Sequence, residues 1–218
     1  MSKILCLETA TTNCSVALSE NGSVIAFRED QSKDYSHAEQ LHVFIESVLK
    51  ETQTDFNSLS AIAVSKGPGS YTGLRIGISA AKGLCYSLDI PLVSVPTLTI
   101  LMKQVETTSG FIVPMIDARR MEVYASVYNI QQEEIRKTAA EILHENSFQE
   151  YLEKGNVTFI GSGVIKFKEI CNHPNAKFIN TLPSSLQMTM LAYQKFKKRE
   201  IEDLAYFEPF YLKDFLKL

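Results

Sequence analysis

The sequence predicts an α/β fold in which one order of elements, β-β-β-α-β-α-β-α, occurs twice. Strand-like and helix-like stretches follow one another in the same order in both halves, with a repeat of roughly 105 residues. The first strand of each half also ends in an acid, Glu8 in the first and Asp117 in the second. We therefore expect two similar subdomains, one over residues 1–108 and a reduced one over residues 109–218, with a cleft between them.

The first half opens with three strands. Residues 3–8 form a short apolar run typical of a buried strand, and residues 14–19 alternate between apolar and polar side chains. The dipeptide Asn21-Gly22 is a strong hairpin signal and leads into a third strand at 24–28. These strands are expected to form an antiparallel meander.

A helix is predicted over residues 36–51. Ser36 and Glu39 fit a capping box at its start. His37 is interpreted as a helix-start or interface residue rather than a catalytic base. Because His42 lies about 140° further round the helix, the two imidazoles cannot share a metal ion.

A glycine-rich stretch at residues 67–77, called here the glycine loop, follows a predicted strand at 59–65 and continues into a predicted helix at 71–87. Such a turn brings backbone N–H groups and a helix N-terminus to one place, which favours anions. Its glycine spacing nevertheless matches neither the Walker phosphate loop nor the dinucleotide-binding fingerprint. Both common nucleotide interpretations are therefore excluded.

The helix at 71–87 carries a stripe of small residues: Gly73, Gly77, Ala80 and Ala81. A glycine inside a helix costs about 1 kcal/mol relative to alanine, so a compensating contact is expected. Three interpretations stay open. The stripe packs on the chain's own sheet, a helix of another subunit approaches it, or the loop binds a nucleotide.

The remaining elements complete the duplication. The first half ends with a strand at 91–95 and a helix from Thr97. The second half is expected to contain strands at 111–117, 122–128, near Ile135, at 157–160 and at 176–179, and helices at 147–154, from Val164 and at 184–198, with a Gly161-Ser162-Gly163 turn.

Composition narrows the function classes. The formal net charge of −3 argues against a protein that grips RNA or DNA by itself. No apolar run reaches the roughly 18 residues of a membrane span, and Glu8 interrupts the position of a signal peptide, so a cytoplasmic location is expected. The cysteines form no Cys-x-x-Cys pair and are expected to be buried free thiols: Cys6, Cys14, Cys85 and Cys171.

This duplication, with an acid closing the first strand of each half, resembles the actin, Hsp70 and sugar kinase (ASKHA) superfamily. Within it, the chain resembles the TsaB (YeaZ) family from end to end. The glycine loop is shared with the paralogous TsaD family, whereas the Asp-Ala-Arg and Pro-x-Tyr-Leu segments favour TsaB. The matching segments are Ile4 to Thr11, the glycine loop, Ile116-Asp117-Ala118-Arg119 with Glu122-Val123-Tyr124, and Glu208-Pro209-Phe210-Tyr211-Leu212.

The resemblance implies a non-catalytic subunit of the bacterial machinery that places N6-threonylcarbamoyl (t6A) on adenosine 37 of tRNAs reading ANN codons. Its implied partners are a TsaD-like transferase and a TsaE-like ATPase, which use the metal and ATP, while this chain carries no cofactor and reaches tRNA only through the complex. The His-x-x-x-His metal motif of TsaD-like chains is absent from this sequence.

On the family pattern, the helices at 36–51 and 71–87 pair with the equivalent helices of TsaD or of a second copy, so that heterodimer and homodimer compete. The residues expected at this interface are Ser36, His37, Leu41, Tyr71, Gly73, Arg75, Gly77, Ile78, Ala80 and Ala81.

The nucleotide cleft is expected to be vestigial. Neither hairpin has the glycine that lets backbone reach phosphate in this superfamily, and Asp117 beside Arg119 is interpreted as a structural ion pair. The vestigial cleft residues are Glu8, Thr11, Asp117, Arg119, Gly161 and Gly163. The alternative is a stand-alone ATP-binding, kinase-like or ATP-hydrolysing enzyme that uses these same residues. No Ser/His/Asp spacing supports a peptidase.

Overall fold

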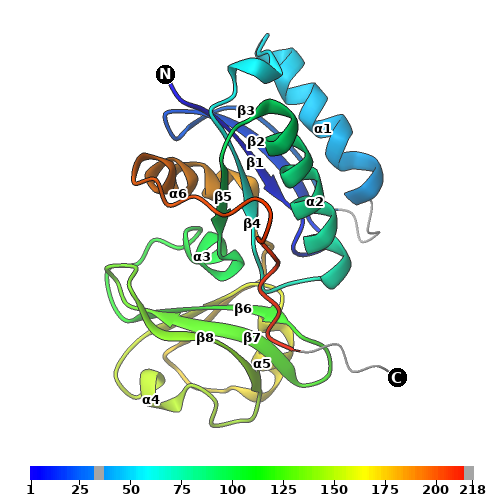
Figure 1. Cartoon of the computed structure of the whole chain (residues 1–218). Coiled ribbons are helices and arrows are strands. Elements are labelled where there is room, and N and C mark those ends of the chain that lie inside the picture. Colours follow the sequence, from blue (N-terminus) through cyan, green and yellow to red (C-terminus); the bar gives the residue numbers. More distant parts are fainter. Residues whose placement is uncertain (32–36, 214–218) are drawn as a thin grey trace. The chain divides into compact units, whose positions relative to one another are not determined.

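The computed structural model describes residues 1–31 and 37–213, which form two compact units (Figure 1). Unit 1 contains residues 1–100 and 183–210, and unit 2 contains residues 101–182 with the segment that starts at Tyr211. Each unit is built on its own five-stranded sheet. Within the described residues, no helix combines the length and the apolar content that crossing a membrane requires.

The sheet of unit 1 has the strand order β3-β2-β1-β4-β5. The first three strands are antiparallel, as predicted, and the last two run parallel to β1. The register places Leu7 of β1 opposite Val16 and Val64. The strand bounds are β1 Lys3–Glu8, β2 Cys14–Glu20, β3 Ser23–Asp30, β4 Ala61–Ser65 and β5 Leu92–Val95.

Helices cover both faces of this sheet (Figure 1). Helices α1 (His37–Glu51) and α2 (Tyr71–Leu88) lie on one face, and α6 (Ser185–Lys197) lies on the other. Because side chains alternate along a strand, Leu7 of β1 packs into the α1–α2 core while Cys6 packs toward α6. Both are fully buried, and the result is a three-layer α/β/α unit.

Unit 2 repeats the same topology. Its strand order, β10-β9-β6-β7-β8, is that of unit 1 with equivalent strands in equivalent places, which confirms the predicted duplication and fold class. Its core contains packed rings of Phe148, Phe159, Phe167 and Phe178. The remaining bounds are α3 Thr97–Met102, β6 Phe111–Asp117, β7 Glu122–Tyr128, β8 Glu134–Ile142, α4 Gln149–Leu152, β9 Val157–Ile160, α5 Val164–Ile170 and β10 Ala176–Ile179.

The units differ from the predicted contiguous division at residue 108, because residues 183–210 belong to unit 1. Met188 and Ala192 of α6 pack against the β1 side chains Ile4 and Cys6. A sheet with parallel strands that is apolar on both faces needs a helical layer on each side. The second layer of unit 1 comes from the far end of the chain.

Candidate functional site

The glycine loop docks on the turn that follows β1. The N–H of Ser70 donates to the carbonyl oxygen of Ala10 at 2.7 Å, and Ser70 Oγ caps α2 by accepting from the N–H of Gly73 at 3.2 Å. A Cβ at Gly69 would lie 2.3 Å from the Ala10 oxygen. Through these contacts the glycine loop joins the turn after β1 to the start of α2.

Gly73 and Gly77, inside α2, have the same explanation. A Cβ at Gly73 would lie 2.1 Å from the carbonyl oxygen of Thr9, and one at Gly77 would lie 2.3 Å from Thr9 Oγ1. The Thr9 hydroxyl also donates to the Gly73 carbonyl oxygen at 2.7 Å. The close approach that these glycines allow is therefore made by the chain's own β1–β2 turn.

Six of the residues predicted at the partner interface are buried in the chain itself. His37, Leu41, Gly73, Gly77, Ile78 and Ala81 are buried inside unit 1. Because an amphipathic helix turns its apolar and small residues toward its own sheet, these six pack within unit 1 and leave little surface for a partner. Ser36 lies outside the described residues.

Three of the predicted residues keep accessible side chains. Arg75 is exposed, and Tyr71 and Ala80 are half-buried. The Arg75 guanidinium lies over the Tyr71 ring, 4.0 Å from its centroid, at the first turn of α2. These three remain candidates for a partner surface.

Gly83 is the residue that sequence reasoning missed. It is exposed, and among the described residues nothing lies within 4 Å of the position that its Cβ would take. Ser79 lies one turn before it and Tyr86, which is 83% exposed, almost one turn after it. The spacing from Ala80 could have revealed it, since Gly83 follows Ala80 by three residues.

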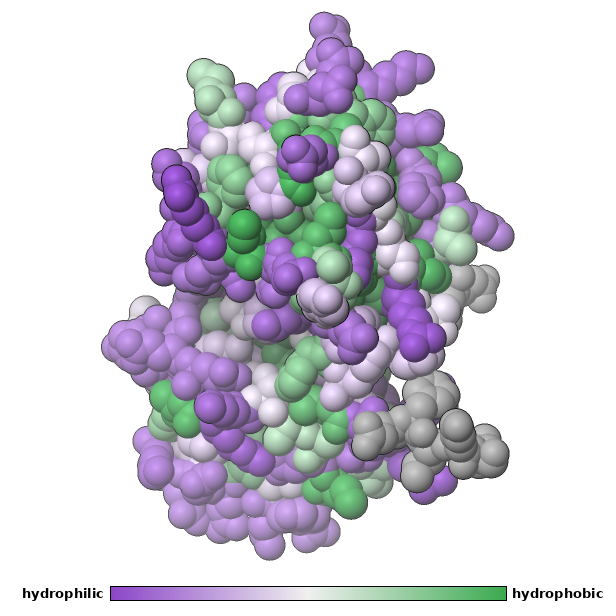
Figure 2. Space-filling model, viewed as in Figure 1, coloured by the Kyte–Doolittle hydropathy of each residue, from purple (hydrophilic) through white to green (hydrophobic). Residues whose placement is uncertain are grey.

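The accessible side of α1 and α2 is therefore the candidate partner surface. It combines the exposed Val43 of α1 with Arg75, Ser79, Gly83 and Tyr86 of α2. Figure 2 shows apolar and polar residues interspersed on the visible face of unit 1. A surface of mixed polarity is typical of protein–protein contacts, whereas small-molecule sites are concave and mostly apolar.

The buried side chain of Glu8 stabilises the first hairpin through hydrogen bonds. Its side chain is fully buried, and Oε1 accepts hydrogen bonds from the Ala10 N–H at 2.7 Å and the Ser65 hydroxyl at 2.8 Å. Burial raises the pKa of the Glu8 carboxyl from its ordinary 4.5 to about 7. Thr11 is also buried, and its carbonyl oxygen accepts from His37 Nε2 at 2.7 Å.

Glu8→Gln should remove a pH dependence of stability. Between pH 4.5 and about 7 the folded chain keeps a proton that the unfolded chain releases, so rising pH lowers the free energy of unfolding by about 1.4 kcal/mol per unit. The loss totals about 3 kcal/mol. Urea unfolding from pH 5 to 8 should show this loss in the difference between wild type and Glu8→Gln, where other titrating groups cancel. A constant difference would contradict it.

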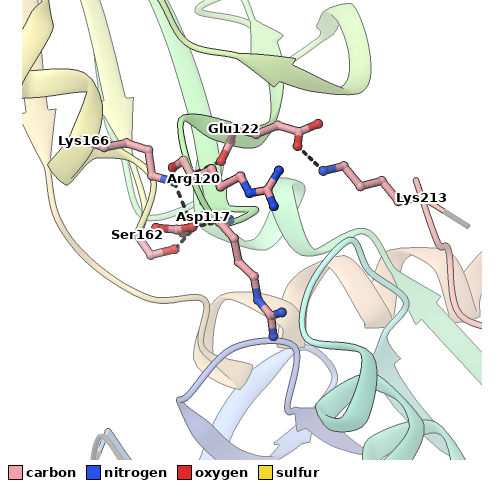
Figure 3. A network of polar contacts seen from close by, with 7 residues as sticks. Asp117, Arg120, Glu122, Ser162, Lys166 and Lys213 are labelled. Atoms are coloured by element: carbon pink, nitrogen blue, oxygen red, sulfur yellow. Dashed lines mark hydrogen bonds and ion pairs between the residues drawn. The ribbon is translucent and has the colours of Figure 1, made fainter. Parts of the chain in front are cut away.

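Asp117 closes the second hairpin in a similar way (Figure 3). Its Oδ1 accepts from the Arg119 N–H at 2.6 Å and pairs with Lys166 Nζ at 2.9 Å, while its own N–H donates to Ser162 Oγ at 3.1 Å. Asp117 is in a structural ion pair, but its partner is Lys166. The prediction of Arg119 as the partner is wrong, because Arg119 supplies only its backbone.

The glycines of the Gly161-Ser162-Gly163 turn serve packing in unit 2. A Cβ at Gly161 would lie 2.2 Å from the carbonyl oxygen of Met115, and one at Gly163 would lie 2.7 Å from Val123. The turn is thus pressed against β6 and β7.

Several known proteins are similar to this chain over most of its length. The family model of TsaD, tRNA N6-adenosine threonylcarbamoyltransferase, matches residues 31–215. The tRNA threonylcarbamoyladenosine biosynthesis protein TsaB of Escherichia coli is 30% identical over 97% of this chain and 95% of its own length. The structure of YeaZ from Pseudomonas aeruginosa is 28% identical, with a TM-score of 0.83 over 97% of this chain and 100% of that one.

The match to a transferase is shorter. The tRNA N6-adenosine threonylcarbamoyltransferase of Halalkalibacterium halodurans is 34% identical over 42% of this chain and only 31% of its own length. TsaB and YeaZ, in contrast, match along almost the whole of both chains. Together with the duplicated topology, this end-to-end match shows that the chain belongs to the TsaB (YeaZ) family.

Proposed function

We propose that this chain is a cytoplasmic, non-catalytic subunit for t6A formation on tRNA, which activates a TsaD-like transferase together with a TsaE-like ATPase. The observation that carries the proposal is the match to TsaB of E. coli, a tRNA threonylcarbamoyladenosine biosynthesis protein, over nearly the full length of both chains. The tRNA is reached within the complex, and ATP and metal belong to the partners.

The two hairpins support an accessory role. Glu8 is buried and accepts a hydrogen bond from the backbone N–H of Ala10, and Asp117 is paired with Lys166. Carboxylates that aim a metal or activate a nucleophile must reach the reacting atoms, whereas these two hold the hairpins of their own units. The stand-alone ATP-hydrolysing alternative gains no support from either residue.

The partner surface in this proposal is the accessible side of α1 and α2. Gly83 offers a place where a partner's helix can approach closely, because no side chain of the described residues lies within 4 Å of the position that its Cβ would take. Tyr86, almost one turn further along α2, and Val43 of α1 supply exposed apolar area on the two helices. Since a second copy would use the same surface, homodimer and heterodimer are expected to compete.

A drop-out assay tests the function. The tRNA, threonylcarbamoyl-adenylate, the cognate TsaD-like protein, the TsaE-like ATPase and ATP are combined with and without this chain, and modified adenosine 37 is measured over several turnovers. Modification should depend on the chain, while the chain alone hydrolyses no ATP. Undiminished modification without it would refute the proposal, and ATP turnover by the chain alone would favour the enzyme.

A further inference from the structure

The β6–β7 turn of unit 2 carries two arginines in an unfavourable backbone conformation. Arg119 has φ 70° and Arg120 has φ 48°, both in the left-handed region. Residues other than glycine cost roughly 1–2 kcal/mol each there, and asparagine or glycine would relieve the strain. Two arginines nevertheless occupy these positions, so we expect a contact of their side chains to compensate for the strain.

One lysine, Lys166, holds the turn through three hydrogen bonds (Figure 3). Lys166 Nζ donates to Asp117 Oδ1 at 2.9 Å, to the Arg120 carbonyl oxygen at 2.5 Å and to the Glu122 carbonyl oxygen at 3.1 Å. Its side chain is only 13% exposed. Lys166 therefore fixes the turn at three points. The two arginines project from a turn whose backbone is held in place.

The carboxylates of this turn already have partners. Asp117 pairs with Lys166, and Glu122 pairs with Lys213. Among the described residues, neither the Arg119 nor the Arg120 guanidinium forms an ion pair, and both arginines are exposed. Four cations and two anions leave the turn with a formal charge of about +2, in a chain whose total is −3.

The backbone of the turn is mostly occupied. The N–H groups of Asp117, Ala118, Arg119 and Glu122 all donate within unit 2. A loop that cradles the phosphates of a nucleotide needs such groups free. The exposed guanidinium groups of Arg119 and Arg120 remain as donors, and they match phosphate oxygens in a bidentate geometry.

We infer that Arg119 and Arg120 contact the phosphate backbone of tRNA when it is bound to the assembled complex. The inference rests on the proposed function, because that function brings a tRNA to the complex. Side-chain contacts to successive phosphates suit two neighbouring arginines on a rigid turn. The negative total charge of the chain agrees with binding that needs the complex rather than this chain alone.

The test is the salt dependence of tRNA binding by the complex of this chain with its TsaD-like partner. Each phosphate contact contributes about 0.7–0.9 to the slope of log K against log salt. Arg119→Gln/Arg120→Gln should therefore weaken binding and reduce the slope by about 1.4–1.8. The matched control is Lys137→Gln/Lys177→Gln, which removes two exposed charges from other strands of unit 2 and should leave the slope unchanged. The variant Arg119→Lys/Arg120→Lys keeps both positive charges and should retain most of the wild-type slope.

The outcomes separate the two proposals. A wild-type slope in the double glutamine variant would overturn the inference, while the drop-out assay with wild-type chain judges the proposed function independently. Failure of that variant to assemble with the transferase in the absence of RNA would assign the arginines to a protein contact and would also overturn it. A reduced slope with normal assembly supports it.

Discussion

Gly73→Ala is expected to lower the free energy of unfolding of this chain by about 2–3 kcal/mol, as overpacking of a well-packed site does. The new Cβ would lie 2.1 Å from the carbonyl oxygen of Thr9, and a backbone atom cannot move aside as a side-chain end can. The turn after β1 and the start of α2 would have to separate, and the hydrogen bond from Thr9 Oγ1 would be lost. Guanidinium unfolding followed by circular dichroism measures the change.

Gly83→Ala is the matched control, because it makes the same substitution in the same helix. Nothing among the described residues meets a Cβ at this position, so the usual helix preference should apply and raise stability by about 0.5–1 kcal/mol. The two substitutions should thus have opposite signs. If Gly73→Ala were as stable as wild type, the docking of α2 on the β1–β2 turn would be wrong.

Gly83→Leu is expected to reduce stimulation of the transferase at least about tenfold without lowering the stability of the free chain. The leucine fits the isolated unit but occupies the space through which a partner's helix would approach. Disrupting the centre of an interface costs about 2 kcal/mol or more, and 1.4 kcal/mol corresponds to tenfold. The drop-out assay, with complex formation followed by analytical ultracentrifugation, measures both effects.

The choice of glycine decides what this experiment reports. A leucine in Gly77→Leu would clash with Thr9 of the same chain, so this variant would test folding rather than the partner contact. Gln194→Leu, on the exposed side of α6 across the sheet from α2, adds the same apolar side chain away from the proposed surface and should leave stimulation intact. Full stimulation by Gly83→Leu would remove this surface from the proposal.

Local pattern was enough to place the elements. Strand β1 occupies residues 3–8 as predicted, and α2 ends one residue beyond its predicted end. Hydrophobic periodicity and turn residues act over a few positions, so they report element type directly. The duplication and the acids at Glu8 and Asp117 were also visible, since they depend only on order along the chain.

Contacts between distant segments were decided by the tertiary structure. Asp117 could be recognised as an ion-pair residue, but Lys166 lies 49 positions away and nothing local selects it over the adjacent Arg119. Helix α6 could be placed in sequence, yet its packing on the first sheet depends on that sheet's second apolar face.

The glycines of α2 show the same boundary between sequence and structure. The glycines in the sequence of α2 predicted that something approaches the helix closely, because a glycine inside a helix lowers stability unless a close contact compensates. It did not determine what approaches. The fold supplies Thr9 at Gly73 and Gly77 and leaves Gly83 open, since the side of a helix that faces its own sheet is settled by packing across the whole unit.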